Sequence, residues 1–299
     1  MTGLPVIMTG PPTSLAGFPA DMFRHYWLAW LPYAIATIVL AALAALAGLN
    51  AVGVRKIAPP GMFGVAAVAL AVLGVATATL ADAASEGDGL TVFDRPTWQW
   101  FIDHRSAFAT TVAKIVTTAG STLVMGILAG AVAVLLFVRR RRGDAVLVAV
   151  VAAGGGLIIF LGKRVVSRVR PPEQYRLAIE TNQSFPSGHA LESMAVIGVL
   201  TVLIVAGATS LATTVWVVLV GALLVTAIGV SRLYLGVHWA TDVLEGWLTG
   251  AGWLLLCVTV RRLWRSYRDN REHGSPTGTD PGTTDPEDDR PVVAGPPTL

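Results

Sequence analysis

The sequence predicts an all-α membrane protein, a polytopic helix bundle of about seven spans. Of its 299 residues, 54% are hydrophobic and only 14% are charged, whereas a soluble domain carries about 25% charged residues. Long stretches also lack charge altogether, and about 18 uncharged apolar residues are typical of a helix that crosses a ~30 Å hydrocarbon core. The stretches without Asp, Glu, Lys or Arg are His25–Val54, Ile57–Ala81, Ile115–Val138, Ala145–Gly162, Ser193–Ser231 and Gly246–Val260. This pattern excludes a disordered chain and argues against a soluble enzyme.

The rest of the composition restricts partners and cofactors. The net charge is only +3 and the positive residues are scattered, so no nucleic-acid partner is expected. Cys257 is the only cysteine, which permits no intramolecular disulfide and no cysteine-based metal site. We expect it to be a small core residue or a lipid-facing one.

The first 114 residues divide into a tail, two spans and a polar segment. Residues 1–25 are rich in Pro and Gly and are predicted to form a short N-terminal tail. Residues 26–82 contain span 1, at about 26–49, and span 2, at about 62–81. Residues 83–114 form a polar segment with several acidic residues, and the orientation derived below predicts that it is extracytoplasmic.

This polar segment contains one predicted helix. Asp94-Arg95-Pro96 is typical of a helix start, with Asp94 as the N-cap and the proline in the first turn. Hydrophobic side chains then recur at roughly helical spacing, at Trp98, Phe101, Ile102 and Phe108. Because tryptophan favours the membrane interface, we expect a short interfacial helix that acts as an anchor rather than as a substrate lid.

Residues 115–268 are predicted to form the core of the bundle, spans 3 to 7. Their expected limits are about 115–138, 144–162, 187–206, 211–231 and 237–260. The run Ser193–Ser231 is too long for one crossing at about 1.5 Å per residue, so we divide it at Gly207–Ser210. Three successive glycines in span 4, Gly154 to Gly156, predict close helix packing. Residues 269–299 are expected to be a disordered acidic tail.

Arginines suggest the orientation of the bundle. Seven spans place Arg55, the turn Arg139–Arg142 and the group Arg261–Arg268 on the same side of the membrane. The total of Lys and Arg is even between the two sides, but three cations of the opposite side belong to the motifs described next. Since short basic turns stay inside the cell, we expect this side and the C-terminus to be cytoplasmic, in a plasma-membrane protein.

Ionisable and polar residues gather at the opposite, extracytoplasmic ends of spans 4 to 7. They are Lys163 at the end of span 4, Arg170 beyond it, Ser187, Gly188 and His189 at the start of span 5, Arg232 at the end of span 6, and His238 and Asp242 at the start of span 7. Because successive spans alternate in direction, these ends should meet at one face. Each residue alone could be an interfacial anchor, a helix cap or a buried polar pair. Together they predict a functional site, since ionisable groups are rare at membrane depth.

The cations of this set suggest that the site binds phosphate. Arg170 and Arg232 offer bidentate donors suited to phosphate oxygens, and Lys163 supplies a compact charge. No Asp/Glu cluster suited to Mg²⁺ occurs in the sequence. We therefore expect a metal-independent site without a cofactor.

The start of span 5 strengthens this hypothesis. Pro186 favours a helix start and leaves the amides of Ser187, Gly188 and His189 free at a positive helix end, which is a ready anion site. Gly188 allows close backbone approach, and the hydroxyl of Ser187 adds a donor.

The two histidines can supply the chemistry. His238 and Asp242 are four residues apart and share one helical face. The carboxylate can accept a proton from one ring nitrogen and leave the other as a nucleophile. His189 remains to protonate the leaving oxygen as a general acid.

These residues also resemble a known family. The motifs are Lys163-x6-Arg170-Pro171, Pro186-Ser187-Gly188-His189 and Ser231-Arg232-x5-His238-x3-Asp242. In order and spacing they match the three signature motifs of the type-2 phosphatidic acid phosphatase superfamily, in its bacterial membrane lipid phosphatase branch. The stretch 94–114 also resembles an extracytoplasmic segment of bacterial members.

The resemblance implies a six-helix lipid-phosphatase-like core and metal-independent dephosphorylation through a phosphohistidine. It implies that His238 is the nucleophile, Asp242 its orienting carboxylate and His189 the acid. The implied phosphate-binding residues are Lys163, Arg170, Ser187, Gly188 and Arg232. The implied substrates are lipid phosphates or diphosphates: phosphatidate, phosphatidylglycerophosphate, undecaprenyl diphosphate or other polyprenyl diphosphates. The expected partners are such a substrate and membrane lipids, and the sequence predicts no oligomeric state.

Some features depart from a minimal member, and other functions stay open. The extra N-terminal span and the acidic tail have no predicted role. Glu192 and Glu245 lie one turn after His189 and Asp242, and Glu192 could face the site or pair with an arginine. The same motifs would serve a lipid phosphotransferase. A transporter would place its charges near span centres rather than at span ends, and a vanadate-dependent haloperoxidase, which shares the motifs, would be soluble.

Overall fold

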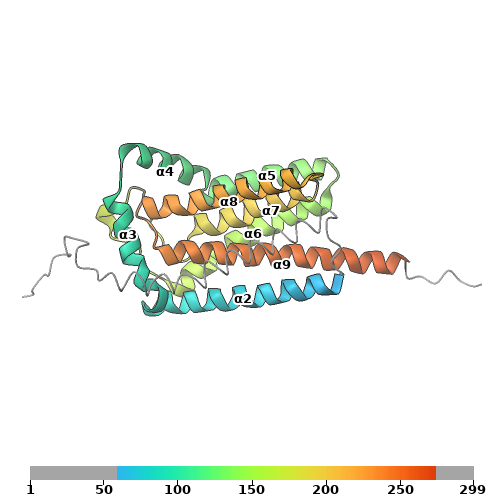
Figure 1. Cartoon of the computed structure of the whole chain (residues 1–299), viewed down its shortest axis with the longest axis horizontal. Coiled ribbons are helices and arrows are strands. Elements are labelled where there is room, and N and C mark those ends of the chain that lie inside the picture. Colours follow the sequence, from blue (N-terminus) through green and yellow to red (C-terminus); the bar gives the residue numbers. More distant parts are fainter. Residues whose placement is uncertain (1–58, 274–299) are drawn as a thin grey trace, which may run out of the picture. The chain divides into compact units, whose positions relative to one another are not determined.

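The computed structural model describes residues 59–273, so the predicted N-terminal tail, span 1 and residues 274–299 lie outside the described part. All regular structure in residues 59–273 is helical (Figure 1), which confirms the predicted class. The α-helices are α2 (Pro59–Glu86), α3 (Asp94–Asp103), α4 (Ala107–Ala119), α5 (Thr122–Val138), α6 (Arg142–Val166), α7 (Gly188–Val205), α8 (Leu211–Tyr234) and α9 (Ala240–His273), with short 3₁₀ turns η2 (Gly89–Phe93) and η3 (Glu173–Tyr175). Helix α9 continues into the segment expected to be the tail.

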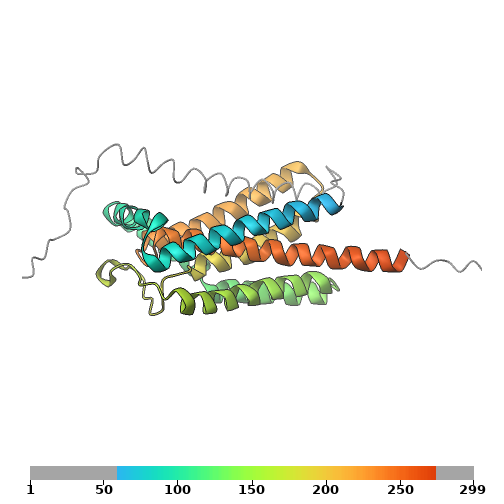
Figure 2. The ribbon, with the colours of Figure 1, turned by 90° about the horizontal axis from the view of Figure 1, so that it is seen from below.

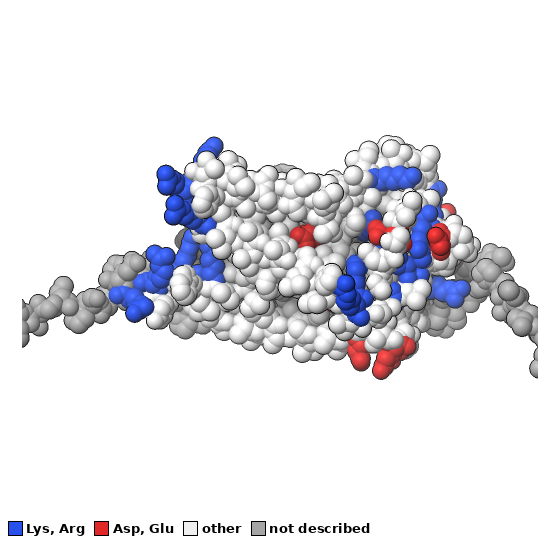
Figure 3. Space-filling view, turned by 180° about the vertical axis from the view of Figure 1, so that it is seen from behind, with Lys and Arg blue, Asp and Glu red and all other residues white. Residues whose placement is uncertain are grey.

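The long helices are those of a multi-pass membrane protein. Within residues 59–273, five helices are long and apolar enough to cross a membrane, and the bent pair α4–α5 makes a sixth candidate. Large apolar side chains point outward, among them Leu123, Trp216 and Leu223, each about 70% exposed. Figure 3 shows a broad band with a single acidic patch in it, between groups of Lys and Arg. Lipid can cover that band, whereas water would not favour it.

Span 3, predicted at about 115–138, consists of two helices, α4 and α5, that meet at 45°. Helix α4 begins at Ala107, before the expected start, and α5 begins after a break whose N-cap Ser121 accepts a hydrogen bond from the Val124 amide at 3.3 Å. Gly120 lies at the break, where an added Cβ would come 2.4 Å from Cγ2 of Ile228. The bend thus follows from a cap and from close contact with α8, which hydropathy does not report.

The division of the long apolar run between spans 5 and 6 is confirmed. Helix α7 ends at Val205 and α8 begins at Leu211. The Ser210 hydroxyl accepts a hydrogen bond from the Thr213 amide at 3.0 Å, which caps the new helix. The weak point of the run is therefore a polar turn at its expected place.

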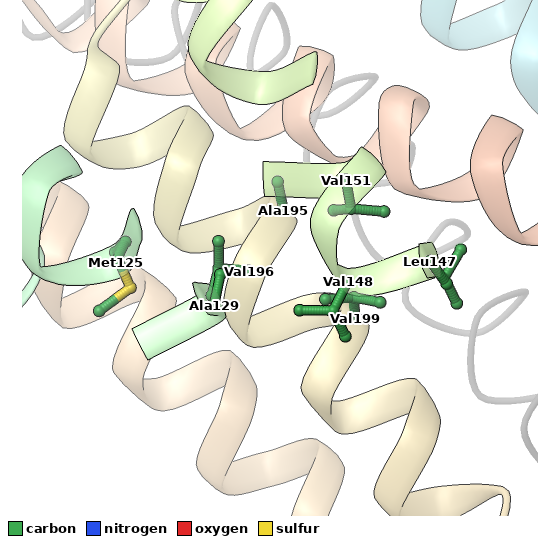
Figure 4. Close-up of a cluster of buried hydrophobic side chains, with 8 residues drawn as sticks. All are labelled: Met125, Ala129, Leu147, Val148, Val151, Ala195, Val196 and Val199. Carbon is green, nitrogen blue, oxygen red and sulfur yellow. The ribbon is translucent and has the colours of Figure 1, made fainter. Parts of the chain in front are cut away.

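The apolar core of the bundle lies between α5, α6 and α7 (Figure 4). Its buried members are Met125, Ala129, Leu147, Val148, Val151, Ala195, Val196 and Val199. The part of α9 up to Val260 packs on α7 at glycines: Cβ atoms at Gly246 and Gly250 would come 2.7 Å from backbone oxygens of α7. Helix α2 lies along α9 (Figures 1 and 2), with Leu73 and Leu80 against Leu248. The unit up to Val260 is thus closely packed; residues from Arg261 on form a second unit.

Close packing at the glycines of α6 makes a first prediction. A Cβ at Gly154 would lie 2.2 Å from the Trp253 ring, whose Nε1 donates to the Val151 carbonyl at 3.0 Å, whereas a Cβ at Gly156 meets nothing within 4 Å. We expect Gly154→Val to lower the stability of the detergent-solubilised protein by about 1–3 kcal/mol through overpacking. Gly156→Val is the matched control, with an unchanged thermal melting temperature. Equal melting of the two variants would contradict this packing.

Candidate active site

The end of α6 and the starts of α7 and α9 meet through direct contacts. Lys163 Nζ, near the end of α6, donates to the Gln183 carbonyl just before α7 at 2.6 Å. The Ser187 amide at the start of α7 donates to the Asp242 carbonyl in α9 at 3.0 Å. Arg170 Nη1 lies 3.1 Å from His238 Nε2. Span parity predicted this meeting, and the loop 167–187 completes it.

The carboxylate of Asp242 holds His238 and is itself held by several donors. His238 Nδ1 lies 3.3 Å from Asp242 Oδ2, as the four-residue spacing predicts. The same oxygen accepts from the Ser184 hydroxyl and, at 2.9 Å, from the Trp239 amide. Arg168 Nη1 donates to Oδ1 at 2.8 Å. A buried carboxylate with this many donors keeps one orientation.

The imidazole of His238 is oriented and electrically neutral. With Nδ1 toward the carboxylate, the assigned tautomer carries its proton there, so Nε2 presents a lone pair toward Arg170. Burial, followed by the charges of Arg170, Arg232 and Lys163, lowers the pKa of His238 well below its usual value. A neutral ring with an available Nε2 lone pair is the form that acts as a nucleophile.

Arg170 belongs to the loop and is almost fully buried, with 6% of its surface exposed. Its Nη1 donates to the Val237 carbonyl at 2.7 Å, and Nη2 donates to Asn182 Oδ1 at 2.6 Å. Burial lowers the pKa of Arg170 to about 10, which leaves the guanidinium charged at neutral pH. The loop therefore fixes one positive charge beside His238.

Arg232 supplies the second buried guanidinium, with 2% of its surface exposed. Its Nη1 donates to the Thr117 hydroxyl of α4 at 2.6 Å, and Nη2 pairs with Glu180. Its Nε has no hydrogen-bond partner among the described residues. The Glu180 carboxylate also reaches Arg170 Nη2 at 3.4 Å, so an anion already bridges the two arginines.

The start of α7 partly matches the predicted anion site. The expectation that the Ser187 amide is free was wrong, because that amide donates to Asp242. The amides of Gly188 and His189 donate to no acceptor within residues 59–273, and the buried Ser187 hydroxyl also lacks a partner there. A Cβ at Gly188 would come 3.3 Å from Ile159, so glycine keeps this turn compact. The side chain of His189 interacts electrostatically with Arg232, His238, Arg170 and Lys163.

Asp94 has a different role from the predicted one. It begins α3 but caps nothing there, since Phe93 is the N-cap residue of that helix. Its carboxylate is buried against α9 instead: Oδ1 accepts from the Thr241 amide at 2.8 Å, and Oδ2 accepts from the Thr241 hydroxyl at 2.6 Å. Arg168 Nη2 donates to Oδ2 at 2.6 Å. From the sequence, Arg168 is interpreted only as one of the scattered positive charges. Its position inside the first motif is a possible signal that it belongs to the site.

The predicted interfacial helix packs onto the site loop. Trp98 is 6% exposed, and its ring lies 5.3 Å from that of Tyr175 and 6.2 Å from that of Trp239. Phe108, predicted to share its face, belongs to α4 and is 80% exposed. Helix α3 is thus tied to the loop 167–187 by its tryptophan, and the predicted four-residue face was wrong.

The loop ahead of α7 also contributes polar residues to the site that the sequence did not predict. Ser184 and Asn182 bind Asp242 and Arg170, and Glu180 joins the two arginines. Isolated polar residues in a loop have no periodicity that would reveal such contacts. Glu192 and Glu245 are buried inside the bundle, each with an Oε2 that has no partner among residues 59–273. Glu192 forms no ion pair with an arginine in that range.

Two further expectations concern metal and thiol chemistry. Among residues 59–273, no three His, Cys, Asp or Glu side chains are grouped so that they could hold a metal ion. Cys257 is a half-buried free thiol packed against the α5–α6–α7 core. It lies on α9, far along the sequence from His238.

The described helices are those of a multi-pass membrane protein that carries a buried histidine beside a buried arginine at one end of its bundle. Residues 144–266 match the family described as the PAP2 superfamily. The matched range includes every predicted site residue.

Two known proteins are similar to part of the chain. The chain is 31% identical over 105 residues to an undecaprenyl-diphosphatase of Sulfolobus acidocaldarius and 36% identical over 100 residues to phosphatidylglycerophosphatase B of Bacillus subtilis. Each match covers 33% of this chain and 47% of the relative, so the chain spans about half the length of these relatives.

A solved structure extends the likeness. The crystal structure of a transmembrane PAP2-type phosphatidylglycerolphosphate phosphatase from Bacillus subtilis superposes with a TM-score of 0.58 at 26% identity. The match covers 65% of this chain and 96% of that one. The described bundle therefore resembles that of a transmembrane PAP2-type phosphatase over 65% of this chain.

Proposed function

We propose that this protein is a metal-independent membrane phosphatase that hydrolyses lipid phosphates or diphosphates through a phosphohistidine. The observation that carries the proposal is the position of His238: a neutral ring held by Asp242 on one nitrogen and faced by Arg170 on the other. This arrangement joins a nucleophile to a positive charge that can bind the group under attack. The named relatives act on a lipid diphosphate and a lipid phosphate.

In the proposed reaction, Nε2 of His238 attacks phosphorus while the bond to the leaving oxygen breaks. His189 gives that oxygen a proton, and Asp242 stabilises the charged ring that results. Water then cleaves the N–P bond, with His189 taking its proton, and inorganic phosphate leaves. Arg170, Arg232 and Lys163 balance the charge of the phosphoryl oxygens.

The anion-binding part of the proposal is supported by donors that lack partners. The Ser187 hydroxyl and Arg232 Nε are buried without a hydrogen-bond partner among residues 59–273, and such groups are costly unless an acceptor arrives. The Gly188 amide at a positive helix end adds a third donor. We assign phosphate binding to these groups and to Lys163, and we place the site on the extracytoplasmic face, with the C-terminus in the cytoplasm.

A phosphate-release screen of the purified full-length protein tests this function. The substrates are phosphatidate, phosphatidylglycerophosphate and polyprenyl diphosphates, each with and without a lipid or sugar acceptor. We expect release that persists in EDTA and that orthovanadate inhibits, because vanadate resembles pentacoordinate phosphate. Loss of activity on chelation would contradict the mechanism. Turnover that requires an acceptor would identify a phosphotransferase instead.

A further inference from the structure

The first turn of α9 carries His238's partner Asp242, and a segment far away in sequence completes it. Trp239 precedes the helix, and its amide donates to Asp242 Oδ2, which is one half of a capping box. The Thr241 amide, in the same first turn, donates to Asp94 Oδ1. A helix N-terminus favours negative charge, so Asp94 of α3 caps α9 from outside.

Arg168 links the two carboxylates. One guanidinium nitrogen donates to Asp94 at 2.6 Å and the other to Asp242 at 2.8 Å, and the second also donates to the Thr241 hydroxyl at 2.7 Å. Both carboxylates are buried, at 3% and 0% exposure. Burial of Arg168 lowers the pKa of its guanidinium, but the charges of Asp242 and Asp94 outweigh that effect, and the pKa is raised. The guanidinium therefore stays charged between them.

We infer that Asp94 is a positioning residue for the proposed reaction: through Arg168 and Thr241 it holds the Asp242 carboxylate against His238. This inference rests on the proposed function. Asp94 does not contact His238, so its effect passes through the Asp94–Arg168–Asp242 chain. It also shares the charge of Arg168, which leaves more of the negative charge of Asp242 to stabilise the charged ring of a phosphohistidine.

The test variant is Asp94→Asn, which keeps the size of the side chain but removes its charge. We expect kcat for phosphate release to fall about 10- to 100-fold, because a small misplacement of a catalytic group has that effect. KM should stay within about twofold, since the phosphate-binding groups are untouched. The matched control is Asp103→Asn on the same helix. Within residues 59–273 its exposed carboxylate has a hydrogen bond to Gln99 alone, so the variant should behave as the wild type.

A double-mutant cycle separates positioning from a merely structural role. In an Asp242→Asn background, Asp94→Asn should cause little further loss, because the group through which it acts is already absent. Arg168→Gln provides a second cycle if Asp94→Asn does not fold. The inference would be overturned if the losses from the two substitutions simply multiplied. It would also be overturned if Asp94→Asn left kcat unchanged or raised KM alone. In each of these cases the proposed function still stands if the wild type releases phosphate and His238→Ala abolishes that release.

Discussion

His238→Ala should abolish phosphate release, with a loss of at least about 10⁴-fold in kcat. The reason is that no other described histidine is held by Asp242 beside a guanidinium, so the variant lacks its nucleophile. Membrane insertion and the yield of detergent-solubilised protein should be unchanged. The measurement is phosphate release under saturating substrate, together with trapping of a labelled phosphoenzyme that is labile in acid and stable in base.

The matched control is His104→Ala. His104 is an exposed residue at the end of α3 whose ring stacks on Trp100, and it has no contact with the site in the described part of the chain. That variant should retain wild-type turnover and phosphoenzyme. Measurable turnover by purified His238→Ala protein would contradict the phosphohistidine mechanism, whichever lipid is the substrate.

His189→Ala should lower the rate of the first turnover by about 10²- to 10⁴-fold on a lipid phosphate, whose alkoxide leaves poorly without a proton. On an aryl phosphate with a stabilised phenolate leaving group, the same variant should lose much less. The measurement is the burst of leaving-group release before the phosphoenzyme is hydrolysed. This difference isolates proton donation from the later attack of water.

Lys163→Ala serves as the contrasting variant for that experiment. Its charge binds the phosphoryl oxygens in our proposal, so its loss should be similar on both substrates. Equal losses on the lipid and aryl substrates for His189→Ala would contradict its role as general acid. They would leave the role of His238 untouched, since the two variants report separate steps.

Much of the bundle was predictable because hydropathy and chain direction are local properties. The absence of charge between Ala145 and Gly162 is enough to predict a span, and alternation of direction brings Lys163, Arg232 and His238 to one end. The bend at Gly120–Ser121 was not predictable in the same way. It depends on a capping hydroxyl and on the approach of Ile228 from another helix.

The same distinction between local sequence properties and contacts made by the fold applies to the candidate site. Motif spacing alone brought together His238 and Asp242, which are neighbours on one helix turn, and predicted the two arginines near them. Only the fold connects Asp94 to Thr241, because 147 residues separate them in the chain. The sequence suggested an N-cap for α3 at Asp94, and the fold instead brings the same carboxylate to the open end of α9. Short-range spacing determines which groups can react, whereas the buried hydrogen bonds that orient them come from segments that meet only when the bundle packs.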